Sequence, residues 1–230
     1  MKTVFRIDLK NDELHDKMGG GVPKNSLMLV EGKDGMGKSI LSQRIIYGAV
    51  KNEQKVTVIS SELTVPAFMN QMKSLNYDIK QAFIKKELKF ISLYPSISHV
   101  SFKDNLIDEV LKEEKLLESD IIVIDRLGEF LLKKDLTLKD CYEYMSLFNK
   151  ITSMGKTIIF CINPEDIDPK FHKILRSGAN VYMVVDEKDL YGNKLQLIRI
   201  LRYSGAASEV EREIPFKVRA GIGIVPELTS

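Results

Sequence analysis

The stretch that decides the fold is SLMLVEGKDGMGKS, residues 26–39. Its first half is a short apolar run, which indicates a buried strand. Its second half, residues 32–39, matches the phosphate-binding pattern G-x-x-x-x-G-K-[ST] at every fixed position. Apolar residues then recur at helical spacing from Ile40 to Val50. The sequence therefore predicts a strand, a glycine loop and a helix in succession.

The glycine loop suits a polyphosphate. Its residues are Gly32, Lys33, Asp34, Gly35, Met36, Gly37, Lys38 and Ser39. In such a loop, successive backbone N–H groups face one concavity, and the next helix directs its positive end there. Lys38 would lie along the β- and γ-phosphate oxygens, and the Ser39 hydroxyl would be a ligand of phosphate-bound Mg²⁺. The alternative is a plain turn in which the lysine and serine only open the helix; the flanking strand and helix favour nucleotide binding.

Length and composition predict one domain over residues 1–230. The chain has 230 residues, of which 44% are hydrophobic, and this suits a single α/β core. Its 34 basic and 32 acidic residues leave a net charge of +2, so no basic face indicates nucleic acid. Cys141 and Cys161 lack a metal-binding spacing and are interpreted as small buried residues of a protein in a reducing cytoplasm. No stretch has the length needed to cross a bilayer, so we expect a soluble protein.

Alternating strand-like and helix-like segments predict a mostly parallel sheet flanked by helices. Capping-box patterns at Ser101 and Thr137 mark two helix starts. After Val181 the segments become strands joined by short turns, which indicates an antiparallel C-terminal end. The expected strands are residues 26–31, 55–61, 88–94, 121–125, 157–163, 181–185, 194–203, 213–218 and 222–225.

Three polar residues end apolar strands at the carboxyl edge, where α/β sheets bind their ligands. Asp125 would hold Mg²⁺, directly or through water; the alternative is capping of the next turn. Glu62 is a candidate base for a water attacking the γ-phosphate, or else a surface glutamate. Asn163 is a candidate γ-phosphate sensor, or else the first residue of an Asn-Pro turn.

Together with these residues, several further segments resemble KaiC/RecA-type ATPases over nearly the whole chain. They are Gly19–Pro23 before the first core strand, Ile214–Val218, and Gly221–Ile224 near the end. Within that superfamily, the single-domain length, the stretch Arg202–Ala206 (RYSGA) and the ending Gly221–Glu227 look most like the FlaH (ArlH) family of the archaeal flagellum, or archaellum.

The resemblance implies a RecA/KaiC-like fold that binds ATP or ADP with Mg²⁺. It also implies a homo-oligomer, a hexameric ring, that docks on the motor ATPase FlaI and other archaellum base components. The place of such a ring is the cytoplasmic face of the archaellum base. A membrane-spanning segment and a nucleic-acid partner are not expected.

Three departures from the superfamily pattern affect the expected hydrolysis, the metal region and the contact with a neighbouring subunit. Such domains often carry two adjacent glutamates after the second strand, whereas Leu63 follows Glu62 here, so hydrolysis is expected to be slow or absent. Arg126 stands where a small hydroxyl residue is usual, which would reorganise the metal region. Of the Lys-x-Arg pair that reaches a neighbour's γ-phosphate, Arg202 matches the first position and Ser204 replaces the second. Arg202 is thus a candidate contact in trans, or else an exposed strand arginine.

Three functions remain open: a nucleotide-gated assembly factor of a motility motor, a RecA/RadA-like DNA-dependent ATPase, and a KaiC-like ATPase or autokinase. A DNA-gripping loop has little room, because only residues 164–169 separate the strand ending near Asn163 from the next helix. There is also no basic, aromatic stacking tract. Ser204 and Ser208 are weak candidates for autophosphorylation. The sequence favours the assembly factor.

Overall fold

The structure is a computed structural model and describes residues 3–10, 12–93, 118–126, 136–190 and 193–227. The strands are β1 Val4–Phe5, β2 Val22–Pro23, β3 Leu27–Glu31, β4 Val56–Ser60, β5 Leu88–Ser92, β6 Ile121–Asp125, β7 Thr157–Ile162, β8 Val181–Leu190, β9 Asn193–Tyr203, β10 Glu213–Arg219 and β11 Gly223–Pro226. The helices are α1 Leu14–Lys17, α2 Lys38–Lys51, α3 Val65–Ser74, α4 Lys80–Ile84, α7 Leu138–Ser153 and α8 Pro169–Gly178, with a 3-10 turn, η2, at Pro164–Asp166.

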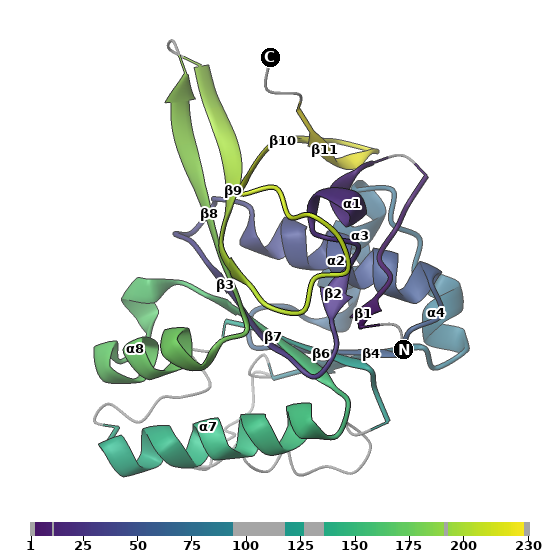
Figure 1. Ribbon diagram of the computed structural model, residues 1–230. Helices are drawn as coiled ribbons and strands as arrows, with labels where there is room; N and C mark the ends of the chain where they lie inside the picture. Colours follow the sequence, from purple (N-terminus) through teal and green to yellow (C-terminus); the bar gives the residue numbers. More distant parts are fainter. Residues whose placement is uncertain (1–2, 11, 94–117, 127–135, 191–192, 228–230) are drawn as a thin grey trace.

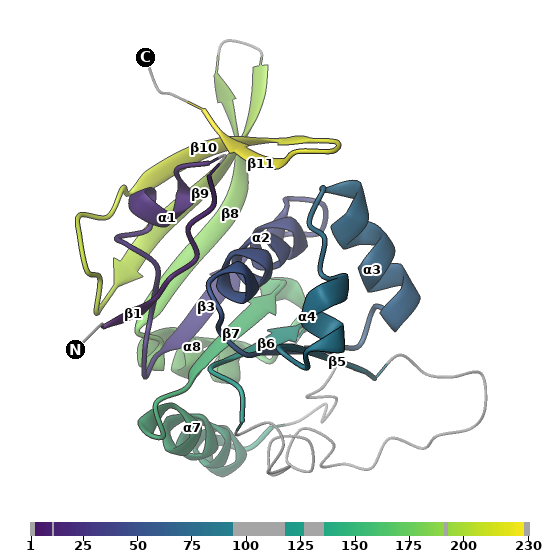
Figure 2. The same ribbon diagram turned by 90° about the vertical axis from the view of Figure 1, so that its right-hand side faces the viewer.

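A nine-stranded sheet forms the centre of the described structure, in the order β11-β10-β9-β8-β3-β7-β6-β4-β5. All neighbours from β8 through β3 to β5 are parallel, and those from β8 to β11 are antiparallel. Helices α7 and α8 cover one face, while α2, α3 and α4 lie on the other (Figures 1 and 2). This arrangement confirms the predicted α/β class with its antiparallel C-terminal end.

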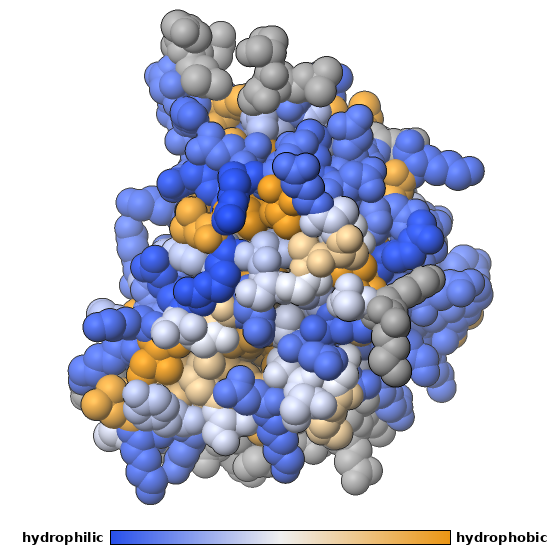
Figure 3. All heavy atoms as spheres, in the orientation of Figure 1, coloured by the Kyte–Doolittle hydropathy of each residue, from blue (hydrophilic) through white to orange (hydrophobic). Residues whose placement is uncertain are grey.

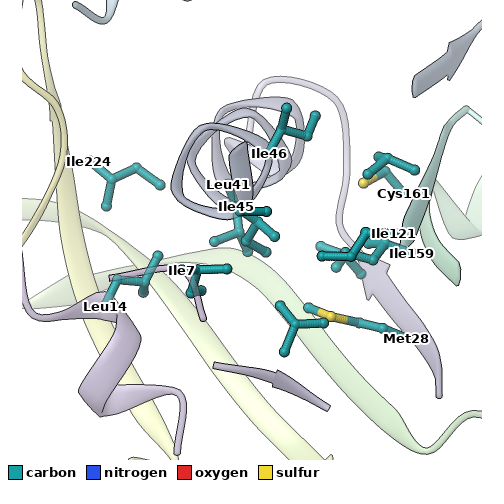
Figure 4. Packing of buried hydrophobic residues seen from close by; sticks show 14 of the residues in the cluster. Ile7, Leu14, Met28, Leu41, Ile45, Ile46, Ile121, Ile159, Cys161 and Ile224 are labelled. Carbon is teal, nitrogen blue, oxygen red and sulfur yellow. The ribbon is translucent and has the colours of Figure 1, made fainter. Parts of the chain in front are cut away.

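The sheet carries a separate hydrophobic core on each face. Alternate residues of a strand enter different cores: Met28 and Val30 of β3 face α2, and Leu27 and Leu29 face α7 and α8. This alternation follows from the two-residue period of a strand, and burial on both faces explains the continuous apolar runs. Figure 4 shows the first core, where Leu41 and Ile45 of α2 lie over the sheet. The first core fixes α2 and the loop before it against β3.

The N-terminal segment packs across α2 and supplies a partner for a fully buried arginine (Figure 2). The Arg44 side chain of α2 donates from Nε and Nη2 to the Asp12 carboxylate, at 2.6 Å in each case. It also donates from Nη1 to the Ile7 carbonyl at 2.9 Å. Because a buried guanidinium is tolerated only with its donors satisfied, these contacts tie the segment to the helix.

Most predicted elements match the observed ones to within two residues. The Thr137 capping box is present, with reciprocal bonds between Thr137 and Asp140, and both cysteines are buried and unpaired. The strand predicted to end at Val185 continues to Leu190 as one arm of the long β8–β9 hairpin. The Ser101 capping box and its helix lie outside the described residues.

On the face shown in Figure 3, hydrophobic residues form small groups among hydrophilic ones. None of the helices in the described ranges is both long enough and apolar enough to cross a bilayer.

Candidate nucleotide-binding site

The glycine loop joins β3 to α2, and its backbone requires glycine at defined places. Gly35 and Gly37 have φ angles of 79° and 102°, in the left-handed region that glycine adopts without steric cost. A Cβ on Gly32 would lie 2.4 Å from the Val185 carbonyl oxygen. The loop is therefore pressed against β8, with its curvature set by glycines.

Lys38 is buried in the curve of this loop. Its Nζ donates to the Lys33 carbonyl at 2.8 Å and lies 3.6 Å from Asp34 Oδ1. A second contact to the loop comes from β9, where Gln196 Nε2 donates to the Met36 carbonyl at 3.4 Å. The lysine ammonium thus stands inside a concave loop at the N-terminus of α2, where an anion is favoured.

The structure places Asp125, one of the two residues predicted to hold Mg²⁺, at the carboxyl edge of the sheet. The role of Asp125 and Ser39 as metal ligands stays a prediction. Asp125 ends β6, is only 7% exposed, and lies in register between Ser60 of β4 and Cys161 of β7. Burial, and then the nearby Asp125 carboxylate, raise the pKa of the Cys161 thiol, so it stays protonated. No group of three or more His, Cys, Asp or Glu suited to a metal occurs among the described residues.

Glu62 lies in a turn that two serines fix. Ser60 Oγ accepts from the backbone N–H groups of Glu62 and Leu63, each at 3.2 Å. Ser92 Oγ, from the end of β5, donates to the Leu63 carbonyl at 2.8 Å. The Glu62 side chain is 42% exposed, and its Oε2 lies 2.8 Å from Arg126 Nε. The turn therefore presents Glu62 at the carboxyl edge, as the sequence predicts.

Arg126 joins the turn to the glycine loop. Besides Glu62, it contacts Asp34, with Nη2 3.3 Å from Oδ1. Its backbone N–H donates to the Cys161 carbonyl at 3.0 Å. The arginine predicted to reorganise the metal region therefore lies beside the loop.

Asn163 takes the turn geometry. Its Oδ1 accepts from the Glu165 N–H at 3.2 Å and caps η2. This geometry is the Asn-Pro turn that the sequence offers as the alternative. The role of Asn163 as a phosphate sensor stays a prediction.

Arg202 makes its observed contacts away from the loop. Its Nη1 donates to the carbonyls of Arg176, Ser177 and Ala179, at 2.9, 3.2 and 2.7 Å, and so caps the C-terminus of α8. In the sheet, Arg202 is paired with Tyr182. Contact with a neighbouring subunit stays a prediction.

Sequence reasoning missed the Glu31 cluster, defined here as Glu31, His172 and Tyr182. Glu31 is the last residue of β3 and only 4% exposed. His172 Nε2 of α8 lies 2.5 Å from its Oε1, and the Tyr182 hydroxyl donates to its Oε2 at 2.7 Å. Burial, with the bond to Glu31, raises the Tyr182 pKa to about 12. A charged residue ending an apolar strand is the available signal, but its partners lie 141 and 151 residues away.

Comparison with known proteins agrees with this geometry. The KaiC ATPase family model matches residues 11–228. The archaeal flagellar ATP-binding protein FlaH of Methanocaldococcus jannaschii is 34% identical over 99% of this chain and 97% of its own length. FlaH of Methanococcus voltae is 33% identical over 98% of this chain and 97% of its own length.

The solved structures give the same result. The crystal structure of the flagellar accessory protein FlaH from M. jannaschii matches with a TM-score of 0.89 and 33% identity, over 98% of this chain and all of that one. This chain belongs to the KaiC-like ATPases. Within that group, it is a homologue of the FlaH proteins.

Proposed function

We propose that this protein is an ATP-binding accessory component of the archaeal flagellum motor, in which bound nucleotide with Mg²⁺ controls assembly. The single observation that carries the proposal is Lys38 buried inside a glycine loop between β3 and α2, in a chain whose full-length homologues are named for ATP binding and the archaeal flagellum. Lys38, the loop N–H groups, Ser39 and Asp125 would hold the nucleotide and its metal.

Nucleotide binding, rather than rapid turnover, is the proposed task. Glu62 is the candidate base predicted from the sequence, and its carboxylate is engaged by Arg126. The second glutamate common in related domains is replaced by Leu63. Both features support slow hydrolysis, so that the nucleotide state persists long enough to act as a signal.

Calorimetry with Lys38→Ala tests the binding step. The loop would lose the cation that faces the phosphates, so we expect ATP affinity to fall at least about 100-fold, or roughly 2.7 kcal/mol. Lys51→Ala is the matched control, because it removes an exposed lysine from the other end of the same helix. A folded Lys38→Ala protein that binds ATP as tightly as the parent would refute the phosphate assignment.

The assembly step follows from linkage. If the ring adds contacts to ATP, ATP must favour the ring, and ADP should do so less. A ring also presents repeated weak contacts to a ring-shaped motor ATPase such as FlaI, at the cytoplasmic face of the archaellum base. Light scattering with ATP, ADP and no nucleotide measures the first link, and capture of FlaI by parent and Lys38→Ala proteins measures the second. A parent that stays monomeric with ATP at high concentration contradicts the proposal.

The same preparation separates the alternatives. Labelled ATP, followed as free phosphate and as protein-bound label, distinguishes turnover from autophosphorylation. A parallel reaction with single-stranded DNA should show no stimulation, because the η2 turn and the start of α8 at Pro169 leave a short connection after β7.

A further inference from the structure

Arg126 forms a bridge between the two sides of the candidate site. Its Nε lies 2.8 Å from Glu62 Oε2, and its Nη2 lies 3.3 Å from Asp34 Oδ1. Asp34 belongs to the glycine loop and also lies 3.6 Å from Lys38 Nζ. One guanidinium therefore connects the candidate base to the loop that would receive the phosphates.

The backbone holds Arg126 in an unusual conformation. Its φ angle is 59°, in the left-handed region that a non-glycine residue with a long side chain seldom adopts. The Arg126 N–H bond to the Cys161 carbonyl extends the β6–β7 pairing by one residue and fixes this geometry. In this conformation the Arg126 side chain lies at the sheet edge, where it contacts Asp34 and Glu62.

The Asp34 side of the bridge is the more exposed side, so it is the contact that a ligand can replace. The Arg126, Glu62 and Asp34 side chains are 28%, 42% and 57% exposed. Ion pairs at such positions are weak compared with buried ones. The guanidinium has several N–H donors, so an incoming polyphosphate can replace Asp34 at Nη2 while Nε keeps its contact with Glu62 Oε2.

We propose that Arg126 is a positioning residue that restrains Glu62 and so keeps hydrolysis slow while nucleotide is bound. The inference rests on the proposed ATP-binding function. In hydrolysis, the water oxygen bonds to the γ-phosphorus, the bond from that phosphorus to the β,γ-bridging oxygen breaks, and ADP leaves. The proton released by the water passes to the Glu62 carboxylate. A carboxylate held by Arg126 has an oxygen already occupied and is turned toward the arginine, so it is less available to the water.

The test uses Arg126→Asn, because asparagine tolerates the left-handed backbone and removes the charge. Single-turnover hydrolysis at saturating ATP should rise about 10-fold, which corresponds to about 1.4 kcal/mol in the barrier. ATP affinity measured by calorimetry should change less than the rate. Arg126→Lys, which keeps the charge but loses the planar fork, should give a smaller rise. The double variant Arg126→Asn/Glu62→Gln should show no rise.

A nucleotide-free measurement supports the same test independently of turnover. The denaturation midpoints of Arg126→Asn, Glu62→Gln and the double variant should be non-additive, with the double variant less destabilised than the sum of the singles. Additive midpoints, no rise in rate, or a rise that persists in the double variant would each overturn the restraint. If the parent binds no ATP, the proposed function fails, and the midpoints still decide whether Arg126 holds Glu62.

Discussion

Glu31 and Glu62 lie at the carboxyl ends of two parallel strands, yet their surroundings are opposite. Glu31 ends β3, its side chain is 5% exposed, and it bonds to His172 and Tyr182 on the α8 side of the sheet. Glu62 follows β4, is 42% exposed, and contacts Arg126 at the edge of the loop. Position at the ligand-binding edge therefore does not by itself give a carboxylate a role. Burial and partners distinguish a structural residue from one that a ligand can reach.

The largest expected effect is on stability at Glu31. Glu31→Ala leaves the Tyr182 hydroxyl and the His172 ring without their shared partner inside the protein, so it should cost about 3 kcal/mol of unfolding free energy. Glu62→Ala should cost less than about 0.5 kcal/mol, because its carboxylate is solvated. Urea denaturation of both variants, with unchanged m values, measures the difference. Equal costs would remove the distinction between the two glutamates.

The fold was largely predictable because its signals are local. The phosphate-loop spacing, the apolar runs of the parallel strands and the Thr137 capping box each lie within a few residues of chain. Strand β6 is an example. The side chains of residues 121–124 are apolar on both faces of the sheet because helices cover both faces, so the run is recognisable in the sequence.

The candidate site was only half predictable, since its partners come from distant segments. Glu62, Asp125 and the glycine loop follow from strand ends, but the contact from Arg126 to Asp34 depends on a left-handed backbone that no local pattern announces. The Arg202 contacts with the end of α8 require the register of β8 and β9, which a bulge between Tyr182 and Met183 shifts. Sequence periodicity does not fix such a shift.

A smaller effect is expected at Tyr182. Tyr182→Phe keeps the ring beneath Arg176 but removes one hydrogen bond to the buried Glu31 carboxylate, so it should cost about 1.5 kcal/mol. Denaturant unfolding gives the value, and Tyr142→Phe on the exposed face of α7 is the matched control. ATP affinity should be nearly unchanged if the Glu31 cluster is structural. A loss of affinity larger than the loss of stability would bring Glu31 into the nucleotide site.

Arg202→Ala should cost about 1 kcal/mol, because the α8 carbonyls that lose their donor are near water and can be resolvated. This variant also tests the predicted contact in trans. Light scattering with ATP should show weaker assembly if Arg202 also reaches a neighbour's phosphate, and Arg202→Lys should restore part of it. If the variant assembles as well as the parent but is less stable, Arg202 caps α8 and makes no contact with a neighbouring subunit's nucleotide.

The smallest expected effect is on the pH dependence of stability and concerns His15. This side chain is partly buried, so its exposure is intermediate between those of Glu31 and Glu62. Burial lowers its pKa below the ordinary value of 6.5, and its Nδ1 accepts from the Ile7 N–H at 3.4 Å. The folded state therefore binds fewer protons than the unfolded state. This contribution to stability is fully present above pH 6.5 and is lost as pH falls through the lower folded pKa.

His15→Asn retains an acceptor for Ile7 but cannot titrate, so its unfolding free energy should fall less than that of the parent as pH drops from about 7 to about 5. Urea midpoints measured across this range, in parallel for the two proteins, give the difference directly. Because the histidine is only partly buried, we expect this difference in unfolding free energy to be smaller than the loss at Glu31. The deeper a titratable side chain is buried, the more its protonation affects folding. Identical pH profiles would show that partial burial at this position leaves the histidine free to protonate without a cost to the fold.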